Sequence, residues 1–460
     1  MSSTRIRSIA AVLVPAALTA TGLQAQSSHT LSTSASAPVV ISGPTAIQGF
    51  SASALGYHSL RRVSVSRDST PNQFVAYVSA MQSSSSLFPI VDVYSFCIPS
   101  NPNCPNPIVA NPRTEVNCSG SRDLDVIVSD GRYGNSGAPT KPLIHVKDPN
   151  DSYSDYPLGC PSGVLGQEAY YLPHVLVKKN GQGSITGVFV SYADPAALGG
   201  SIQSVEINID PNWTPGGGLP CPNGRSGSAP NMGMPKGMPR TVCSHFDSTP
   251  YLGRTEATDV VADSFGNRVG YLIQDYDLAP TGATRRFTWV GSTGLDRNGA
   301  QKAEFEPIPP SPQNFVGSSL GGTLFMTRPN PLVSGDTELV RVDTCAISVG
   351  AASPGLVAEL NLVLPFDYPD NQGFLALLLG TPGPALAIPG FAGLLHLDVL
   401  AGFTAVFGVQ PVQDAAARVL VPVPVGISPG FAVDLQGVVI ETSGPRLGIL
   451  TNLTQLVVLP

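Results

Sequence analysis

Charge is the scarcest property of this sequence. Lys, Arg, Asp and Glu together make up 12% of the 460 residues, about half of the roughly 25% that is usual for soluble globular proteins. Only six residues are Lys, and the formal net charge is −7. A polybasic surface for nucleic acids or for an anionic membrane is therefore not expected, and no nucleic-acid partner is predicted.

The common catalytic motifs are also missing. The sequence holds no P-loop, no dinucleotide-binding fingerprint and no H-E-x-x-H zinc motif, and no G-x-S-x-G segment in the strand–turn–helix context of a nucleophile elbow. Between residues 45 and 343 no segment keeps the 3.6-residue period of an amphipathic helix. These absences weigh against nucleotide binding, against the common hydrolase mechanisms and against a helical fold.

Glycine and proline, in contrast, are abundant. The chain has 48 Gly and 44 Pro, and apolar residues make up 42% of it. So much Gly and Pro favours short strands joined by many turns, while the apolar share is large enough for sizeable cores. The length indicates two or three domains. The composition therefore predicts an all-β, extracellular protein.

The first 25 residues have the three parts of a secretory signal peptide. Arg5 and Arg7 form the positive start, a ten-residue apolar stretch follows, and Ala25 offers a small residue at the cleavage point. The apolar stretch is too short to span a bilayer, which takes about 20 residues. We therefore predict an exported protein, either secreted or held in the cell envelope or periplasm, with no membrane span after signal removal. The Ser/Thr/Ala-rich residues 26–44 are expected to form a flexible lead-in.

Strand patterns recur from residue 45 to residue 343, with polar turns between them. Residues 173–194 hold two apolar runs around Asn180-Gly181, which is a strong hairpin signal. Residues 258–277 repeat the strand–turn–strand form. The strand starts recur at a loose spacing, which favours an irregular β-propeller of about five blades. A β-sandwich with long insertions is the alternative, because it would contain the same strands.

The rest of the chain differs in composition. Residues 344–370 contain SPG and PFDYPDN and little charge, so we expect a linker there. Residues 371–460 carry only six charged side chains and show short apolar runs separated by Gly and Pro turns, a pattern that predicts a small antiparallel β-sandwich. Within it, residues 390–409 are mostly apolar, but His396 and Asp398 alternate with leucines. This period of two predicts strands rather than a membrane helix.

One hairpin resembles a known kind of repeat. The segment ATDVVADSFGNRVGYLIQD (residues 257–275) is similar to the blade hairpins of secreted bacterial β-propellers, in which an Asp-x-x-Gly-Asn turn joins two strands. The matching residues here are Asp263, Gly266 and Asn267. The resemblance implies a propeller fold and no particular activity.

The C-terminal 90 residues resemble a second family. The segments LLLGTPGPALAIPGFAGLLHLD (377–398), VLVPVPVGISPGFAVDLQGVV (419–439) and TNLTQLVVL (451–459) are similar to a C-terminal β-sandwich-like domain of exported proteins from Planctomycete-type bacteria. Gln436 and Thr451-Asn452 stand where the family pattern has Gln and Ser/Thr-Asn. The resemblance implies a bacterial, exported protein with a separate terminal module, and no catalytic residue. Its position suggests a role in attachment or export sorting.

Seven cysteines fit an oxidising compartment, although the number is odd. Six are assigned to disulfides, with three pairs as the working arrangement: Cys97–Cys104, Cys221–Cys243 and Cys118–Cys160. This arrangement leaves Cys345 unpaired, and the spacing does not decide among the alternative pairings. No C-x-x-C spacing is present, so a zinc site is not expected.

Acidic clusters are the best candidates for chemistry. Asp123 and Asp125 would share one face of a strand, and Asp259 and Asp263 lie in the propeller-like hairpin. Two carboxylates about 5–9 Å apart are the acid and base of glycoside hydrolysis. The alternative interpretation is that these residues end turns or protect strand edges.

A second acidic loop, DPNDSYSD, offers oxygen ligands for calcium. Its candidate ligands are Asp148, Asn150, Asp151 and Asp155. The loop lacks the Gly at position 6 and the Glu at position 12 of an EF-hand, so a solvated turn is the alternative. Calcium is the only cofactor that the sequence suggests.

Two functional hypotheses remain open. The first is an exported, non-catalytic binding or cell-envelope-associated protein, with glycans or envelope components as partners. The second is an extracellular carbohydrate-active hydrolase that uses paired carboxylates. Aromatic residues in loops, such as Trp213, would serve either function as platforms for sugar rings, although core packing explains most such residues. Trp289 belongs to the same group.

Overall fold

The fold is built almost entirely from β-strands. The computed structural model describes residues 35–67, 73–84, 90–97, 108–109, 125–129, 143–147, 153–157, 171–179, 185–194, 201–209, 233–235, 240–244, 254–263, 267–277, 284–291, 302–350 and 352–460. The helix within these ranges is α2 (Ala52–Leu55), a single turn capped by Ser51. The sheets are antiparallel except for one short parallel pair. The all-β prediction is confirmed.

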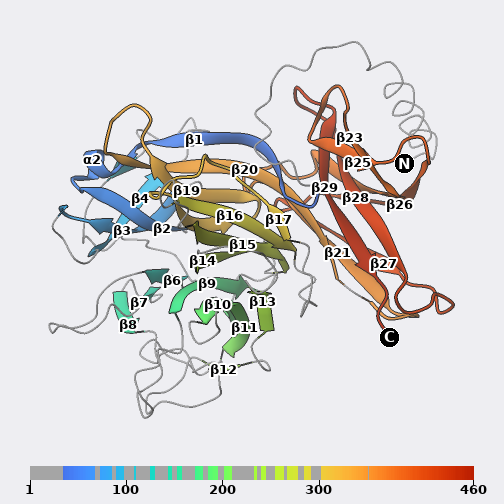
Figure 1. Cartoon of the computed structure of the whole chain (residues 1–460), viewed down its shortest axis with the longest axis horizontal. Coiled ribbons are helices and arrows are strands. Elements are labelled where there is room, and N and C mark those ends of the chain that lie inside the picture. The colour runs from blue at the N-terminus through green and yellow to red at the C-terminus, as the bar shows by residue number, and fades with distance from the viewer. Residues whose placement is uncertain are drawn as a thin grey trace.

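Four sheets follow one another along the chain, each made of strands that are close in sequence (Figure 1). The first contains β2 (Ser59–Arg67), β3 (Gln73–Met81), β4 (Ile90–Cys97) and β5 (Ile108–Val109). The second contains β6 (Asp125–Ser129), β7 (Leu143–Lys147) and β8 (Tyr153–Pro157). The third contains β9 (Tyr171–Lys179), β10 (Ile185–Asp194), β11 (Ser201–Ile209), β12 (Gly233–Pro235) and β13 (Arg240–Ser244). The fourth contains β14 (Arg254–Ala262), β15 (Arg268–Asp277), β16 (Thr284–Gly291) and β17 (Lys302–Glu304).

Both hairpins predicted from the sequence are present. Strands β9 and β10 pair antiparallel, with Val177 opposite Val188. Strands β14 and β15 also pair antiparallel, with Thr258 opposite Ile273. Period-two alternation of apolar residues around a turn signal was therefore sufficient to place these pairs.

A fifth sheet joins the two ends of this region. It contains β18 (Phe315–Leu320), β19 (Thr323–Pro329) and β20 (Thr337–Val349), and its next strand is β1 (Val39–Ser51). Strand β1 pairs antiparallel with β20 over almost its full length, from Val39 opposite Cys345 to Ser51 opposite Glu338. Residues 39–44, which were expected in the flexible lead-in, are thus part of a sheet.

The first strands of the five sheets contact one another in a ring. Strand β2 contacts β6, β6 contacts β9, β9 contacts β14, β14 contacts β18, and β18 contacts β2. Ser319 of β18 donates a hydrogen bond from its Oγ to the carbonyl of Val260 in β14, at 2.9 Å. A Cβ at Gly317 would stand 2.6 Å from the carbonyl oxygen of Val63 in β2, so only glycine permits this approach of β18 to β2. The ring passes through all five sheets.

Apolar cores lie between neighbouring sheets. One core joins β14–β16 to β19 and β20, and it contains Phe287, Trp289 and Met326. Another joins β2–β4 to β1, β19 and β20, and it contains Phe50 and Phe325. Because β20 contributes to both cores, the fifth sheet is packed on each side.

The C-terminal region continues directly from β20. The second half of β20 pairs with β21 (Val357–Val363), and β21 pairs with β27 (Ala416–Pro422). Residues 344–370, for which a linker was expected, therefore contain the end of β20 and the whole of β21. Gly and Pro in this stretch lie mainly in the turns around β21 rather than in an extended connection.

A second sheet and a small ribbon complete this region, drawn in orange to red in Figure 1. The sheet has the order β24 (Phe391–Ala392), β29 (Gly448–Val457), β28 (Ala432–Glu441), β22 (Gly373–Gly380) and β26 (Phe403–Pro411). The ribbon contains β23 (Pro382–Ala387) and β25 (Leu394–Leu397). A large core that includes Cys345, Leu362, Leu377 and Ile449 joins the β20–β21–β27 strands to β22, β28 and β29.

Most of residues 390–409 lie in the strands β24, β25 and β26, as the period-two pattern predicted, with turns between the strands. Within the described ranges, the chain has no helix of the length and apolar character needed to cross a membrane.

Candidate functional site

Asp263 closes the hairpin between β14 and β15. Its Oδ1 accepts a hydrogen bond from the backbone N–H of Asn267 at 2.7 Å, and its Oδ2 accepts one from Asn267 Nδ2 at 2.8 Å. The backbone N–H of Asp263 donates to the Asn267 carbonyl at 2.9 Å. Only 8% of Asp263 is exposed. The bonding of both carboxylate oxygens within the turn gives Asp263 a structural role there.

The other catalytic candidates are only partly within the structure. Asp123 lies outside the described residues. Asp125 is the first residue of β6 and Asp259 lies in β14, so their backbone positions are on strands of the ring. Their side chains lie outside the described atoms.

The calcium candidates have a similar status. Asp148, Asn150 and Asp151 lie outside the described residues, and Asp155 is placed in β8 without its side chain. Elsewhere in the described ranges, no group of three or more His, Cys, Asp or Glu side chains is close enough to hold a metal ion. The calcium site stays a prediction.

Cysteine is described fully at one position. Cys345 is a free thiol with no exposed surface, in the core between β20 and the C-terminal sheet. Burial raises the pKa of this thiol far above its usual range, so it is kept protonated and unreactive. The side chains of the other six lie outside the described atoms: Cys97, Cys104, Cys118, Cys160, Cys221 and Cys243. The three predicted pairs stay predictions.

Trp289 is a core residue and not a sugar platform. It is 2% exposed, and its ring packs over Gly270 of the neighbouring strand β15. A Cβ at Gly270 would stand 2.2 Å from Trp289 Cζ2. Trp213 lies outside the described residues.

Gln436 connects three strands of the C-terminal region. Its Nε2 donates hydrogen bonds to the carbonyls of Leu394 and Thr451, both at 2.7 Å, and its Oε1 accepts one from the backbone N–H of His396 at 2.9 Å. The side chain is fully buried, so each of these bonds satisfies a polar group that water does not reach. Gln436 thereby fixes β25 and β29 against β28.

Asn452 of β29 likewise satisfies buried backbone groups, and it connects β29 to β20. Its Oδ1 accepts a hydrogen bond from the backbone N–H of Ile347 in β20 at 2.7 Å, and its Nδ2 donates to the Ile347 carbonyl at 3.1 Å. The neighbouring Thr451 accepts a hydrogen bond from the backbone N–H of Gly437 at 2.9 Å. The polar residues that carry the family resemblance are therefore structural.

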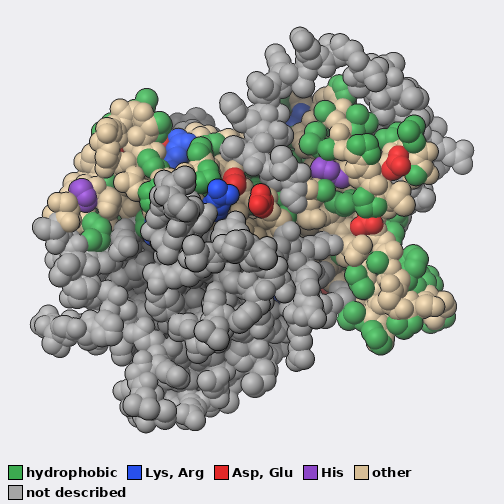
Figure 2. All heavy atoms as spheres, viewed as in Figure 1, with side chains coloured by type: hydrophobic (Ala, Val, Ile, Leu, Met, Phe, Trp, Pro, Cys, Tyr) green, Lys and Arg blue, Asp and Glu red, His purple; other side chains and the backbone are tan. Residues whose placement is uncertain are grey.

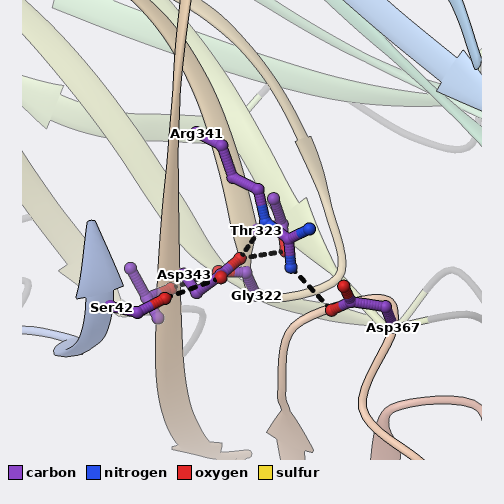
Figure 3. Close-up of polar contacts among 7 residues, drawn as sticks. Ser42, Gly322, Thr323, Arg341, Asp343 and Asp367 are labelled. Atoms are coloured by element: carbon purple, nitrogen blue, oxygen red, sulfur yellow. Dashed lines mark hydrogen bonds and ion pairs between the residues drawn. The ribbon is translucent and has the colours of Figure 1, made fainter. Parts of the chain in front are cut away.

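A connected polar cluster joins the two regions of the chain (Figure 3). Asp343 of β20 accepts hydrogen bonds from Arg341 Nε at 2.7 Å, from Thr323 Oγ1 at 2.8 Å and from Ser42 Oγ at 2.8 Å. Arg341 Nη2 reaches Asp367, in the segment after β21, at 2.6 Å. We call these five residues the junction cluster.

Packing and charge hold the guanidinium of the junction cluster in place. Burial disfavours the charge on Arg341, but hydrogen bonds to Asp367 and Asp343 outweigh it and raise the pKa of the side chain. The guanidinium also lies 4.9 Å from the ring centroid of Phe366. Phe366 in turn meets Phe74 of β3 edge to face, with centroids 4.9 Å apart. The segment after β21 is therefore fixed to β20 and to the first sheet.

Sequence reasoning did not find the junction cluster. Arg341 and Asp343 are two residues apart on one strand, so their side chains share a face, and this spacing was a usable signal. The contributions of Ser42 and Asp367 depend on pairing between distant segments. The cluster pairs one cation, Arg341, with two carboxylates, Asp343 and Asp367, and it connects β20 to the segment after β21, which makes it a structural junction.

Comparison with known proteins adds no relative. No protein-family model matches the chain, and no curated protein sequence is significantly similar to it. The two resemblances accordingly depend on the residues quoted for them above.

Proposed function

We propose that this chain is an exported, non-catalytic binding or cell-envelope-associated protein, in which a five-bladed β-propeller is followed by a C-terminal β-sandwich. The observation that carries the proposal is the contact ring of β2, β6, β9, β14 and β18. Radially arranged sheets whose first strands surround one axis are the arrangement of a propeller. Propellers commonly use the loops at the ends of this axis to bind partners.

The pairing of β1 supports the same arrangement. A propeller needs its last blade joined to its first elements, or the ring opens at that point. Here the N-terminal strand β1 completes the sheet of β18–β20, and its Ile47 and Phe50 pack in the core shared with β2–β4. The last sheet is thereby connected to the start of the chain.

The signal peptide supports export. Residues 1–25 have the positive start, apolar stretch and small cleavage residue of a secretory signal. An exported β-propeller with few charges is suited to glycans or to envelope components as partners. We assign the protein to the secreted or cell-envelope fraction on this basis.

The test is a binding experiment with the mature chain, residues 26–460. The chain is applied to immobilised glycans and mixed with a purified bacterial envelope fraction, with and without calcium. We expect retention by at least one of them. Failure to bind any glycan, protein or envelope fraction would refute the proposal.

A hydrolase is the second candidate, favoured by the positions of two aspartates. Asp125 and Asp259 both lie on strands of the contact ring, β6 and β14, and the hydrolase hypothesis requires paired carboxylates at the centre of a propeller. The measurement is reducing-sugar release from a panel of polysaccharides. The hydrolase would be established if Asp125→Asn and Asp259→Asn each abolish sugar release. The control variant Asp398→Asn, in the C-terminal region, should leave the release unchanged. No release from the panel would leave the binding function.

A further inference from the structure

The far end of the C-terminal region exposes an unusual number of apolar side chains. Two loops meet there: residues 352–356, before β21, and residues 423–431, between β27 and β28. The half-exposed to fully exposed apolar side chains at this end are Leu356, Val357, Leu420, Val425 and Phe431. We call this end the apolar tip.

Hydrogen bonds fix the two loops of the apolar tip together. The N–H of Val423 donates to the Leu356 carbonyl at 2.8 Å, and the N–H of Gly355 donates to the Val423 carbonyl at 2.9 Å. Val425 lies beside Gly355, because a Cβ at Gly355 would stand 3.0 Å from Val425 Cγ1. The exposed side chains therefore belong to a defined surface and not to independent loops.

Phe431 is fixed at the same end. Its carbonyl accepts a hydrogen bond from the N–H of Val458 at 2.9 Å, and Val458 bridges to Ala352. Leu420 and Val357 are on the neighbouring strands β27 and β21, on the same face, since Val357 is opposite Pro422 and Leu420 is opposite Glu359. The apolar tip thus runs from the loops onto the ends of these two strands.

Charged side chains are absent from the apolar tip. Residues 350–358, 419–433 and 457–460 include no Asp, Glu, Lys or Arg. The nearest charges on the same face are Arg418 and Glu359, which pair with each other at 2.6 Å. In Figure 2 the lobe at the lower right, where the chain ends, shows green side chains and no blue or red ones. A surface of this kind fits an uncharged apolar partner.

We propose that the apolar tip inserts into the interface of a lipid bilayer with neutral headgroups, and so attaches the protein to a membrane surface. This inference rests on the envelope association proposed above and names the envelope component concerned. Shallow burial of apolar side chains at the boundary of headgroups and acyl chains is a known mode of membrane attachment. Because no charged side chain of the tip has to leave water, insertion desolvates no charged side chain, and we expect attachment to depend little on salt.

A second copy of the chain fits the apolar tip less well. Five side chains of this size present on the order of 500 Å² of apolar surface, below the roughly 800 Å² per partner of a standard interface. Strand addition is also opposed, because Pro422 and Pro424 at this end of β27 have no N–H to donate to a new strand. The tip is also formed mainly by loops, which suits shallow insertion.

The test is sedimentation of the mature chain with vesicles of phosphatidylcholine and phosphatidylethanolamine, at 50 mM and 500 mM salt. The variant Leu356→Ser/Val425→Ser/Phe431→Ser removes three apolar side chains of the tip. The control Leu332→Ser/Leu400→Ser removes two side chains that are more than 90% exposed but lie elsewhere. We expect the unmodified chain and the control to bind at both salt concentrations, and the tip variant to lose at least tenfold in bound fraction.

Thermal unfolding of all three chains verifies that they fold, and retention by the glycan panel and envelope fraction is measured alongside. If the tip variant binds vesicles as well as the unmodified chain does, the inference is overturned. Absence of vesicle binding by the unmodified chain, with retention by the envelope fraction kept, overturns the inference and leaves the proposed function standing. Loss of both kinds of binding refutes both. A halved molecular mass of the tip variant in light scattering would assign the tip to self-association and overturn the inference.

Discussion

At the scale of the residue, small and polar side chains decide which strands lie together. Gly270 makes room for the Trp289 ring, and Gly317 lets β18 approach β2. Gln436 and Asn452 satisfy buried backbone groups that their own sheets leave unpaired. Each of these roles requires a partner from another strand.

The first prediction concerns Gly270. In Gly270→Ala the new methyl group meets the Trp289 ring and the carbonyl of Val290, so the ring must move within a packed core. We expect a loss of about 1–3 kcal/mol in the free energy of unfolding. Urea denaturation measures it. The control is Gly291→Ala, where a Cβ meets nothing within 4 Å, and a loss as large in the control would contradict the explanation.

The second prediction concerns His396. Burial lowers the pKa of His396 below its ordinary value of 6.5, because its neutral form is favoured in the fold. A histidine with a lowered folded-state pKa contributes stability that is complete above the unfolded value and is lost as the pH falls through the folded one. We therefore expect the melting temperature to fall as the pH decreases from 7 to 5.

The variant His396→Phe removes this titration and keeps an apolar ring of similar size. Its melting temperature should depend less on pH over the same interval than that of the unmodified chain. His58→Gln is the control, since His58 is exposed on the other region of the chain. An unchanged pH dependence in His396→Phe would show that other groups cause the effect.

At the scale of the element, the long strands β1 and β20 connect parts of the fold that are distant in the sequence. Strand β1 connects the start of the chain to the fifth sheet, and β20 belongs to that sheet in its first half and to the C-terminal layers in its second. Each strand has thirteen residues, so β20 is long enough to pair in both sheets and β1 is long enough to follow it. The hydrophobic pattern does not reveal which partner each half of a strand takes.

The third prediction is a deletion of β1. Removing residues 26–51 exposes the edge of β20 and takes Ile47 and Phe50 out of their core. We expect the shortened chain to lose its cooperative thermal transition and to aggregate, because a long unpaired edge is a template for association. The control removes residues 26–34 alone and should melt like the mature chain. A cooperative transition in the chain without β1 would show that the fold does not require β1 to cover the edge of β20.

At the scale of the whole molecule, the two regions are built as one body. They share β20, the Arg341–Asp367 ion pair of the junction cluster, and the contact of Phe366 with Phe74. In this arrangement the apolar tip has a fixed orientation relative to the sheets of the first 340 residues. Attachment through the tip would therefore also orient the loops of these sheets.

The fourth prediction follows from this connection. Arg341→Met leaves Asp343 and Asp367 without their shared cation, and Arg341 and Asp343 are each 13% exposed. We expect a loss of about 3 kcal/mol in stability and, in calorimetry, a single transition that shifts downward as a whole. Arg418→Met breaks the exposed pair with Glu359 and should cost at most about 1 kcal/mol. Two separate transitions in the unmodified chain would contradict the single body.

The sequence alone determined the fold class and the local pairs. Alternation around a turn is a local property, so the hairpins of β9–β10 and β14–β15 and the strands of residues 390–409 were predictable. The composition likewise excluded a helical fold.

Only the tertiary structure decided what is distant in sequence. Three contacts join segments that are far apart in the sequence, and the local pattern of one segment does not predict its partner. They are the pairing of Val39 with Cys345, the hydrogen bonds of Asn452 to Ile347, and the junction cluster of Ser42, Arg341 and Asp367. A linker was expected at residues 344–370 because the stretch contains SPG, PFDYPDN and little charge, but Leu360 and Leu362 are buried, and the strand that holds them, β21, belongs to the core. The physical reason is that burial depends on what packs against a strand, which its own residues do not specify.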